Sequence, residues 1–388
     1  MHRRILHLLA NWKWTERSEP VVDLALAQQR LGSQVCLGCG TAPEEAGESV
    51  ALRAEGKGLH RVTTLSMSKH LRLCSLLRDI PKLNALLNAF RPHVVHFHMR
   101  NDHLLGAFAG VPVGRAVPSV RSCYDPSGPK TDLRSRWLYH RHTDGLIVVS
   151  QRAKSKARQL FGFRDDAVLI AEPGVDLDRF SPHRQVDLTR KDLGLRQDAF
   201  VIGMVTRIRE SRRIDVVLEA VHILTERFPQ IELFIVGRGR KGAVETVIEG
   251  PSRSMGIGDK VILPGYCNGD RLVAAYQAMD VLVYPVPGTD RTCRTVREAL
   301  ASGVPVLAPN VGFLPELLEE GINGRFIPLS AHRLADVLAD LIDNPAQLHR
   351  MGINAADAAK RRFSTHLQAH NVLAFYERLL AAGKPHSY

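Results

Sequence analysis

Residues 284–309, YPVPGTDRTCRTVREALASGVPVLAP, decide the fold of this chain. A β-branched run at 281–284 leads into a loop broken by proline and glycine, and a helix-like segment and a second apolar run at 304–307 follow. This order predicts strand, loop, helix and strand, with the loop at the carboxyl edge of a parallel sheet, where open α/β folds bind ligands. The free N–H groups and the dipole of the helix favour an anion at its amino end.

Two acids belong to this segment, Asp290 in the loop and Glu298 on the helix. A carboxylate can accept hydrogen bonds from two neighbouring hydroxyls of a sugar or a ribose. The acids can therefore hold opposite ends of an extended ligand, while backbone N–H groups near 292–295, with Arg291 or Arg294, hold a diphosphate. The alternative is a surface helix with solvated charges, because acid pairs at any one spacing are common.

Length and composition describe a globular protein with an acidic partner. The 388 residues fit two or three domains, and 45% of them are hydrophobic. The net charge of +12 and the pI near 9.7 point to nucleotides, an anionic lipid surface or nucleic acid, although a soluble basic protein without such a partner has the same composition.

Six cysteines and the amino-terminal segment bear on the location of the protein. Only Cys36 and Cys39 form a CxxC pair, and no second pair completes a zinc site or a disulfide framework, so a reducing cytoplasm is expected. The start, MHRRILHLLANW, lacks the cleavage site of a signal peptide. No apolar run approaches the roughly 20 residues of a membrane span, so any membrane contact is expected to be peripheral.

The chain alternates predicted strands and helices, which is typical of parallel sheets covered by helices on both faces. The alternation breaks at 172–182 and starts again at 200–206, so we expect an α/β protein with two doubly wound, Rossmann-like domains facing a central cleft. The predicted domains are 1–180 and 181–365, and 366–388 is expected to be a helix that packs back on the first domain. The predicted strands are 5–9, 35–37, 93–98, 116–122, 146–149, 200–206, 231–236, 261–263, 281–284, 304–307 and 324–327, and the predicted helices are 20–31, 71–90, 216–227, 331–343, 345–362 and 367–382.

Two further loops of the second domain suit phosphate. Residues 206–213, TRIRESRR, follow a predicted strand and contain four arginines, which bind phosphate bidentately and keep their charge. Residues 236–242, VGRGRKG, follow the next strand, and their glycines allow a close approach of the backbone. This loop lacks the later acid of a dinucleotide fingerprint, so it is interpreted as a nucleotide contact. Solvated surface loops are the alternative for both.

Four segments of the second domain resemble, in the same order, the donor domain of the large family of retaining glycosyltransferases called family 4, or glycosyl transferases group 1, which has the GT-B fold. The segments are VTRIRESRRID at 205–215, IELFIVGRGR at 231–240, VILPGYCNGDRLVAAYQAMDVLVYP at 261–285 and DRTCRTVREALASGVPVLAPNVGFLPELLEEGINGRFIP at 290–328. The resemblance implies an acceptor-binding first domain and a donor-binding second domain.

The resemblance gives roles to individual residues. It implies that Arg207 and Arg212 bind the donor diphosphate and stabilise the leaving phosphate, that Glu298 holds the ribose, and that Asp290, where the family has Glu, contacts the transferred sugar. The other implied donor-binding positions are Gly237, Gly239, Tyr266, Thr292, Cys293, Arg294 and Thr295. The implied substrate is a UDP-, GDP- or ADP-sugar, transferred with retention and with the leaving phosphate as base, and no metal or other cofactor is required.

The first domain resembles the family less closely. Many relatives carry a Gly-Gly loop where residues 12–25 contain no glycine, and Lys13 or Arg17 can instead contact a phosphate or an anionic acceptor. Relatives often carry His-Asp where this chain has Tyr124-Asp125. Tyr124 can hydrogen-bond the sugar or the acceptor, but a pKa near 10 makes tyrosine a poor base, so no general base is identified.

The acceptor is predicted from the charge of the first domain. Trp137, Leu138 and Tyr139 stand among cationic residues in 134–142, and such a surface can dock on an anionic leaflet or hold a lipid-linked acceptor. An ordinary helix with one apolar stripe is the alternative. The expected acceptor is a bacterial envelope saccharide, as in lipopolysaccharide synthesis, at the inner face of the cytoplasmic membrane.

Other classes of function stay open. A GT-B-like nucleotide-sugar epimerase or hydrolase needs an acid/base pair that the sequence does not reveal. A non-catalytic partner subunit agrees with the missing glycine loop and histidine. A nucleic-acid binder agrees with the net charge, but only 6% of the residues are aromatic and no reading motif is evident.

Overall fold

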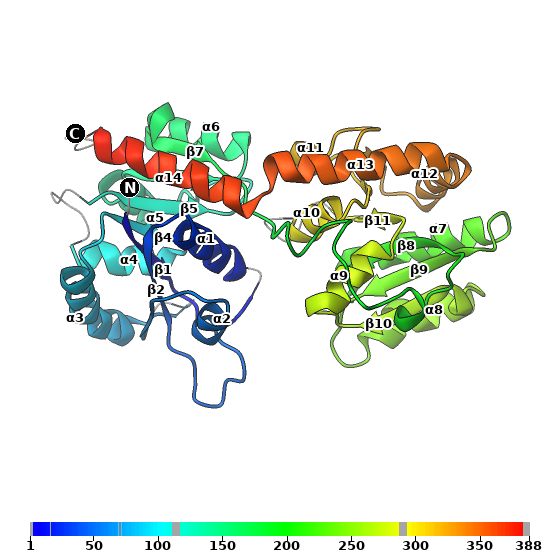
Figure 1. Ribbon diagram of the computed structural model, residues 1–388, viewed down its shortest axis with the longest axis horizontal. Helices are drawn as coiled ribbons and strands as arrows, with labels where there is room; N and C mark the ends of the chain where they lie inside the picture. The colour runs from blue at the N-terminus through cyan, green and yellow to red at the C-terminus, as the bar shows by residue number, and fades with distance from the viewer. Residues whose placement is uncertain are drawn as a thin grey trace. The chain divides into compact units, whose positions relative to one another are not determined.

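The computed structural model describes residues 3–15, 17–68, 70, 72–110, 117–286 and 293–382. The chain forms two compact units (Figure 1). Unit 1 comprises residues 1–174 and 365–388, and unit 2 comprises residues 175–364. The chain passes from one unit to the other at 174–175 and returns at 364–365, so the carboxyl-terminal helix belongs to the first unit.

Unit 1 contains a seven-stranded parallel sheet with the order β3-β2-β1-β4-β5-β6-β7. The strands at the centre of this sheet carry buried β-branched and leucine residues, as expected for a sheet covered on both faces. The strands are β1 Arg4–Leu9, β2 Gln34–Gly40, β3 Val62–Leu65, β4 Val94–Phe97, β5 Ser119–Cys123, β6 Gly145–Val148 and β7 Val168–Ile170. The helices are α1 Glu19–Arg30, α2 Val50–Gly56, α3 Leu73–Phe90, α4 Arg100–Phe108, α5 Leu133–Arg141, α6 Gln151–Phe161 and α14 Thr365–Ala381.

Helix α14 completes the core of unit 1. It lies beside α1 on one face of the sheet (Figure 1). Val372 and Phe375 of α14 are fully buried against Ile5 and Val120 of the strands and Leu24 of α1. On the other face, α3 and α4 cover alternate residues of the same strands, so both faces are covered by helices.

Unit 2 contains a six-stranded parallel sheet with the order β10-β9-β8-β11-β12-β13. The strands are β8 Phe200–Val205, β9 Ile231–Val236, β10 Val261–Gly265, β11 Val281–Val283, β12 Val306–Ala308 and β13 Gly324–Phe326. The helices are α7 Ile214–Thr225, α8 Gly250–Ser254, α9 Gly269–Gln277, α10 Arg294–Ala301, α11 Leu314–Leu317, α12 Ala331–Asp343 and α13 Pro345–Arg362. The strand order reverses between β8 and β11, which is the point where such sheets bind ligands.

The predicted class of two doubly wound α/β units is confirmed. The prediction missed the short strands β3 and β7 and the helices α2, α4, α5, α6, α8 and α11. No disulfide joins the cysteines that the structure describes, and burial raises the pKa of Cys36 to about 11 and that of Cys39 to about 12. Within the described ranges, no helix is long and apolar enough to cross a bilayer.

The packing of α14 predicts that its apolar face stabilises unit 1. Phe375→Ala is expected to lower the free energy of unfolding by about 3–5 kcal/mol, because it removes a fully buried ring. All three tryptophans, Trp12, Trp14 and Trp137, belong to unit 1, so denaturant unfolding followed by tryptophan fluorescence measures this effect. His370→Ala, at an exposed position of the same helix, is the control and should change little. Equal stability of the two variants would contradict this account of the core.

Candidate functional site

Three loops of unit 2 are joined at the carboxyl edge of its sheet. The backbone N–H of Gly237, after β9, donates to the carbonyl of Gly265 at the end of β10 over 2.9 Å. Ile208 and Gly239 form a parallel bridge between the loops after β8 and β9. Gly237 has φ of 154°, and a Cβ there would lie 1.7 Å from the carbonyl oxygen of Thr206, so only glycine fits. The predicted glycine loop therefore lies directly beside the arginine loop.

The two arginines predicted to bind the diphosphate differ in exposure. Arg207 is exposed, while Arg212 is only 8% exposed at the end of a 3-10 turn, Glu210–Arg212. The buried Nε of Arg212 has no hydrogen-bond partner among the residues that the structure describes. A buried donor without a partner is costly, and a phosphate oxygen is a matching acceptor for a guanidinium.

Helix α10 starts on the other side of the point where the strand order reverses. Cys293 precedes it in the left-handed conformation, with φ of 43°, and Glu298 is buried on its second turn. Arg294 Nε donates to one carboxylate oxygen of Glu298 over 2.6 Å, and the Tyr276 hydroxyl donates to the other over 2.9 Å. Burial and the Glu298 charge raise the pKa of Tyr276 well above its usual value. Each oxygen keeps a further lone pair, so the fixed carboxylate can still accept bonds from hydroxyls.

Of the remaining predicted donor residues, the structure describes Tyr266 and Thr295. Tyr266 is 60% exposed, and the Arg238 guanidinium stacks on its ring at 4.7 Å, which gives a flat cationic surface beside the glycine loop. Thr295 is half-buried in the first turn of α10. Asp290 and Thr292 lie outside the described residues. Arg238 lies in the predicted phosphate loop 236–242 and Tyr276 in the family-like segment 261–285, but neither residue was given a role of its own, because their partners Tyr266 and Glu298 are distant in the sequence.

In unit 1, the glycine-free loop after β1 is held by its own side chains. Asn11 Nδ2 donates to the carbonyl of Lys13 over 2.9 Å, and the Ser18 hydroxyl donates to the same oxygen over 2.7 Å. Lys13 is exposed and lies over the Trp12 ring at 5.0 Å. Asn11 and Ser18 therefore hold this loop in one conformation by hydrogen bonds to its backbone.

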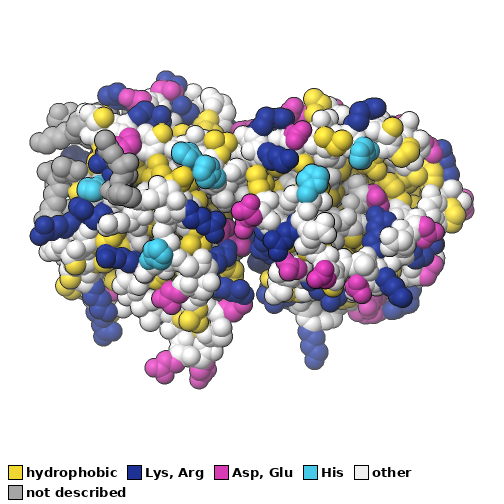
Figure 2. All heavy atoms as spheres, in the orientation of Figure 1, with side chains coloured by type: hydrophobic (Ala, Val, Ile, Leu, Met, Phe, Trp, Pro, Cys, Tyr) yellow, Lys and Arg dark blue, Asp and Glu magenta, His cyan; other side chains and the backbone are white. Residues whose placement is uncertain are grey.

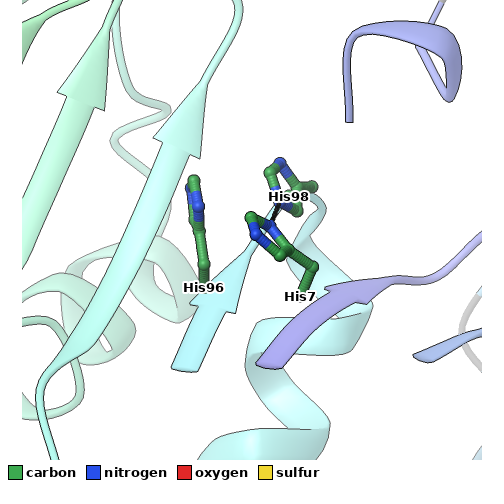
Figure 3. Close-up of side chains that lie close together, drawn as sticks. All are labelled: His7, His96 and His98. Carbon is green, nitrogen blue, oxygen red and sulfur yellow. Dashed lines mark hydrogen bonds between the residues drawn. The ribbon is translucent and has the colours of Figure 1, made fainter. Parts of the chain in front are cut away.

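Three buried histidines, His7 on β1, His96 on β4 and His98 just after β4, have ring nitrogens within 4.8 Å of one another (Figure 3). Burial lowers the pKa of His7 to about 4 and holds those of His96 and His98 well below the usual 6.5. The rings are therefore neutral, which is the form that ligates metals. However, every ring nitrogen already has a protein partner: His7 bonds Gln28 and His98, His98 also bonds Tyr124, and His96 bonds Ser122 and Tyr376.

The charges around this cluster disfavour a cation. Arg121 lowers the pKa of His96 and His98, and Tyr124 beside His98 is kept neutral because burial raises its pKa. A metal would have to displace hydrogen bonds and face a buried guanidinium. The histidines are therefore described as a buried hydrogen-bond network. The sequence signal was the spacing of His96 and His98, which places both on one side of a strand.

An arginine cluster, defined as Arg100, Arg121 and Arg134, lies near this network. Arg121 is 7% exposed and lies 3.8 Å from the fully buried Asp102, whose carboxylate accepts backbone N–H groups from Ala10 and Met99. Burial raises the pKa of Asp102 to about 7, although Arg121 and the backbone bonds lower it. Each of the three arginines has one buried nitrogen without a hydrogen-bond partner among the described residues. The cluster suits an anion.

Comparison with known proteins identifies the class. The model "Glycosyltransferase Family 4" matches residues 21–179, and "Glycosyl transferases group 1" matches residues 185–358. D-inositol 3-phosphate glycosyltransferase of Actinosynnema mirum is 32% identical over 326 residues, which are 79% of this chain and 77% of that protein. D-inositol 3-phosphate glycosyltransferase 2 of Catenulispora acidiphila is 32% identical over 311 residues, 75% of this chain and 72% of that protein.

Solved structures show the same architecture. Anabaena Alr3699/HepE, in complex with UDP, matches with a TM-score of 0.77 and 19% identity over 97% of this chain and 100% of that one. A glycosyltransferase from Rickettsia africae ESF-5 matches with a TM-score of 0.79 and 16% identity over 98% and 99%. The fold is therefore that of a GT-B glycosyltransferase. The chain belongs to the family that the two models describe, glycosyltransferase family 4 or glycosyl transferases group 1, and it is a glycosyltransferase.

The buried histidines predict loss of stability in acid. His7, His96, His98 and His103 have lowered pKa values, with burial as the largest cause, so the stability that they contribute is present above pH 6.5 and is lost below it. Asp102 has a raised pKa, so its contribution to stability grows as the pH falls from about 7 to 4. This single group opposes the four histidines, whose summed contribution is larger. Unit 1 is therefore expected to lose stability from pH 6.5 to 4.5.

Denaturant unfolding followed by tryptophan fluorescence at several pH values checks this. His103→Asn should flatten the pH slope by about 1.4 kcal/mol per unit, because one buried neutral imidazole is removed. The exposed His370→Ala variant is the control. A slope that is the same in His103→Asn and in the parent chain would show that the buried histidines do not set the acid sensitivity.

Proposed function

We propose that the enzyme transfers a glycosyl unit from a nucleotide-sugar bound on unit 2 to a hydroxyl of a saccharide or polyol acceptor. Arg207 and Arg212 hold the diphosphate, Glu298 holds the ribose, and Asp290 contacts the transferred sugar. The buried Nε of Arg212, without a partner at the point where the strand order reverses, is the observation that carries this proposal. The UDP complex of HepE, a protein of the same fold, supports a uridine nucleotide.

The chemistry follows from where charge develops. Negative charge builds on the leaving β-phosphate as the bond to the sugar breaks, and the Arg212 guanidinium, which is already desolvated, stabilises it without reorganisation. Arg212 is held in this state before any ligand arrives. The residues proposed here need no metal or other cofactor, because the arginines and the amino end of α10 supply the positive charge. With the leaving phosphate as base, the transfer retains the configuration of the sugar.

Two acceptor classes are supported by different observations. A bacterial envelope saccharide, as in lipopolysaccharide synthesis, agrees with the basic surface of the chain. A phosphorylated polyol agrees with the names of the relatives, D-inositol 3-phosphate glycosyltransferases, and with the arginine cluster in unit 1. We favour an acceptor that bears a phosphate. Turnover of a neutral saccharide and no turnover of a sugar or polyol phosphate, with the same UDP-sugar, would contradict this choice.

Helix α5 also supports peripheral contact with the inner face of the cytoplasmic membrane. Leu138 and Tyr139 are buried, but Leu133 is 86% exposed and Trp137 is 40% exposed on the outer side. Exposed Leu73 and Leu77 lie on α3, where Figure 2 shows cationic and hydrophobic side chains together at the lower left. Exposed apolar side chains beside cations match an anionic leaflet.

Membrane contact predicts selective binding to anionic vesicles. The protein should sediment with vesicles that contain phosphatidylglycerol and not with phosphatidylcholine vesicles, because the latter offer no net charge. Leu133→Ser should weaken sedimentation several-fold, whereas Ile353→Ser, an exposed apolar position of unit 2, should not. Sedimentation that does not depend on lipid charge or on Leu133 would argue against this surface.

The proposed donor site predicts that substitutions of Arg212 and Glu298 lower the affinity for UDP. Arg212→Gln and Glu298→Ala should each weaken UDP binding by about 10- to 100-fold, because each removes a charged hydrogen-bonding group worth about 1.5–3 kcal/mol. Isothermal titration calorimetry measures this change. Arg333→Gln, an exposed arginine on α12, is the matched control. UDP affinity that is unchanged in both site variants, in protein that is folded, would refute the donor site.

A further inference from the structure

Four side chains form a continuous hydrogen-bond chain from the core of unit 1 to the carboxyl edge of its sheet. Gln28 Oε1 on α1 lies 2.8 Å from His7 Nε2 on β1. His7 Nδ1 lies 2.9 Å from His98 Nε2, the contact drawn as a dashed line in Figure 3. His98 Nδ1 lies 2.9 Å from the hydroxyl of Tyr124. Gln28 and His7 are fully buried, and His98 is nearly so.

Gln28, the first residue of this network, sets the direction of hydrogen-bond donation along it. An amide oxygen only accepts, so Gln28 requires a proton on His7 Nε2. A neutral His7 then has a bare Nδ1, which must accept from a proton on His98 Nε2. A neutral His98 in turn has a bare Nδ1, which accepts from the hydroxyl of Tyr124. The proton of Tyr124 is thus committed to the protein interior, and its oxygen, which also meets the Ser122 hydroxyl, keeps a lone pair for a further hydrogen bond.

We propose that Gln28, His7 and His98 are positioning residues that fix Tyr124 as a hydrogen-bond acceptor for the hydroxyl of the acceptor substrate. Tyr124 directly follows β5, at the edge of the sheet where parallel α/β units bind ligands. This inference rests on the proposed glycosyl transfer and adds to it the side chains that orient the attacking hydroxyl. A hydroxyl that donates to Tyr124 has its own lone pair directed away from the tyrosine, which leaves that pair available for attack.

The network orients the hydroxyl of the acceptor substrate but does not remove its proton. A proton passed from Tyr124 to His98 would create a buried imidazolium, and burial together with His96, His7 and Arg121 disfavours that charge. Gln28, at the end of the chain, has no basic nitrogen to receive it. The leaving phosphate is therefore the base in the proposed reaction, and Tyr124 stays protonated, since burial raises its pKa.

A second branch holds the same edge. His96 Nδ1 lies 2.7 Å from the Tyr376 hydroxyl of α14, and His96 Nε2 lies 2.8 Å from the hydroxyl of Ser122 on β5. The rings of His96 and His98 lie with their centroids 4.1 Å apart, so the two branches pack against each other. Rotation of His98 away from Tyr124 is opposed by this contact as well as by His7.

The direction of hydrogen-bond donation along the chain can be measured in the parent protein, with two variants used only to assign the signals. In protein with ¹⁵N-labelled histidine, two-bond ¹⁵N–¹H correlation spectra distinguish protonated from bare ring nitrogens, and His7→Asn and His98→Asn spectra assign the two rings. We expect both residues to carry their proton on Nε2. A proton on Nδ1 of His98, or an imidazolium at neutral pH, would overturn the proposal. A stoichiometric transition metal in the purified protein that is lost in His98→Asn would also overturn it, because the rings would then be ligands.

Kinetics test whether the network acts through Tyr124. Gln28→Leu removes the amide oxygen that bonds His7 Nε2 and puts an apolar side chain of similar size in the same buried position. It should raise the KM for the acceptor about 10-fold and leave the KM for the nucleotide-sugar within about twofold, as should Tyr124→Phe. Gln29→Leu, the neighbouring residue that bonds the Gly58 carbonyl instead, is the control.

The double variant separates this role from a general effect on folding. If Gln28 acts through Tyr124, Gln28→Leu should have little further effect in the Tyr124→Phe background. Effects that multiply would show that Gln28 acts elsewhere, and they would overturn the inference. Loss of UDP binding in Arg212→Gln tests the proposed function separately, so its failure and the failure of this inference give different results.

Discussion

The nucleotide site proposed on unit 2 depends on one desolvated positive charge, the guanidinium of Arg212. Arg212 is buried at the carboxyl edge of the second sheet, and its Nε has no protein acceptor among the described residues. A fold keeps such a group only at a cost of about 1–3 kcal/mol, and a bound diphosphate would offset that cost. Gly237 contributes to this site because it has no side chain. The loop after β9 can therefore approach the carbonyl of Thr206 in the arginine loop.

The carboxyl edge of the first sheet is built differently, from buried polar side chains that bond one another. Asp102 joins the end of β1 to the start of α4 through backbone N–H groups, and the histidines join α1, β1, β4 and β5. A network with all its ring nitrogens satisfied is rigid, since each lost bond leaves a costly buried group. The carboxyl edge of the second sheet thus keeps a buried donor without a partner among the described residues, while every ring nitrogen of the three histidines in the first sheet is hydrogen-bonded.

Local patterns were enough to predict the sheets and part of the donor site. The run at 281–284, the loop after it and Glu298 on the next helix form one continuous segment, so their order on the chain gives their order in space. Glu298 was therefore found, but its partner Tyr276, 22 residues earlier, was not. The chain from Gln28 through His7 to His98 was missed for the same reason, because it joins residues up to 91 positions apart that only the folded sheet brings together. The short strand β7 lacks the length that makes a pattern recognisable.

A crystal structure of the enzyme grown with UDP shows whether Arg212 binds the diphosphate. We expect diphosphate oxygens within hydrogen-bond distance of Arg212 and Arg207 and ribose hydroxyls on Glu298, with the Tyr276 bond to Glu298 retained. A nucleotide bound elsewhere, with the Nε of Arg212 still unpartnered, would contradict it.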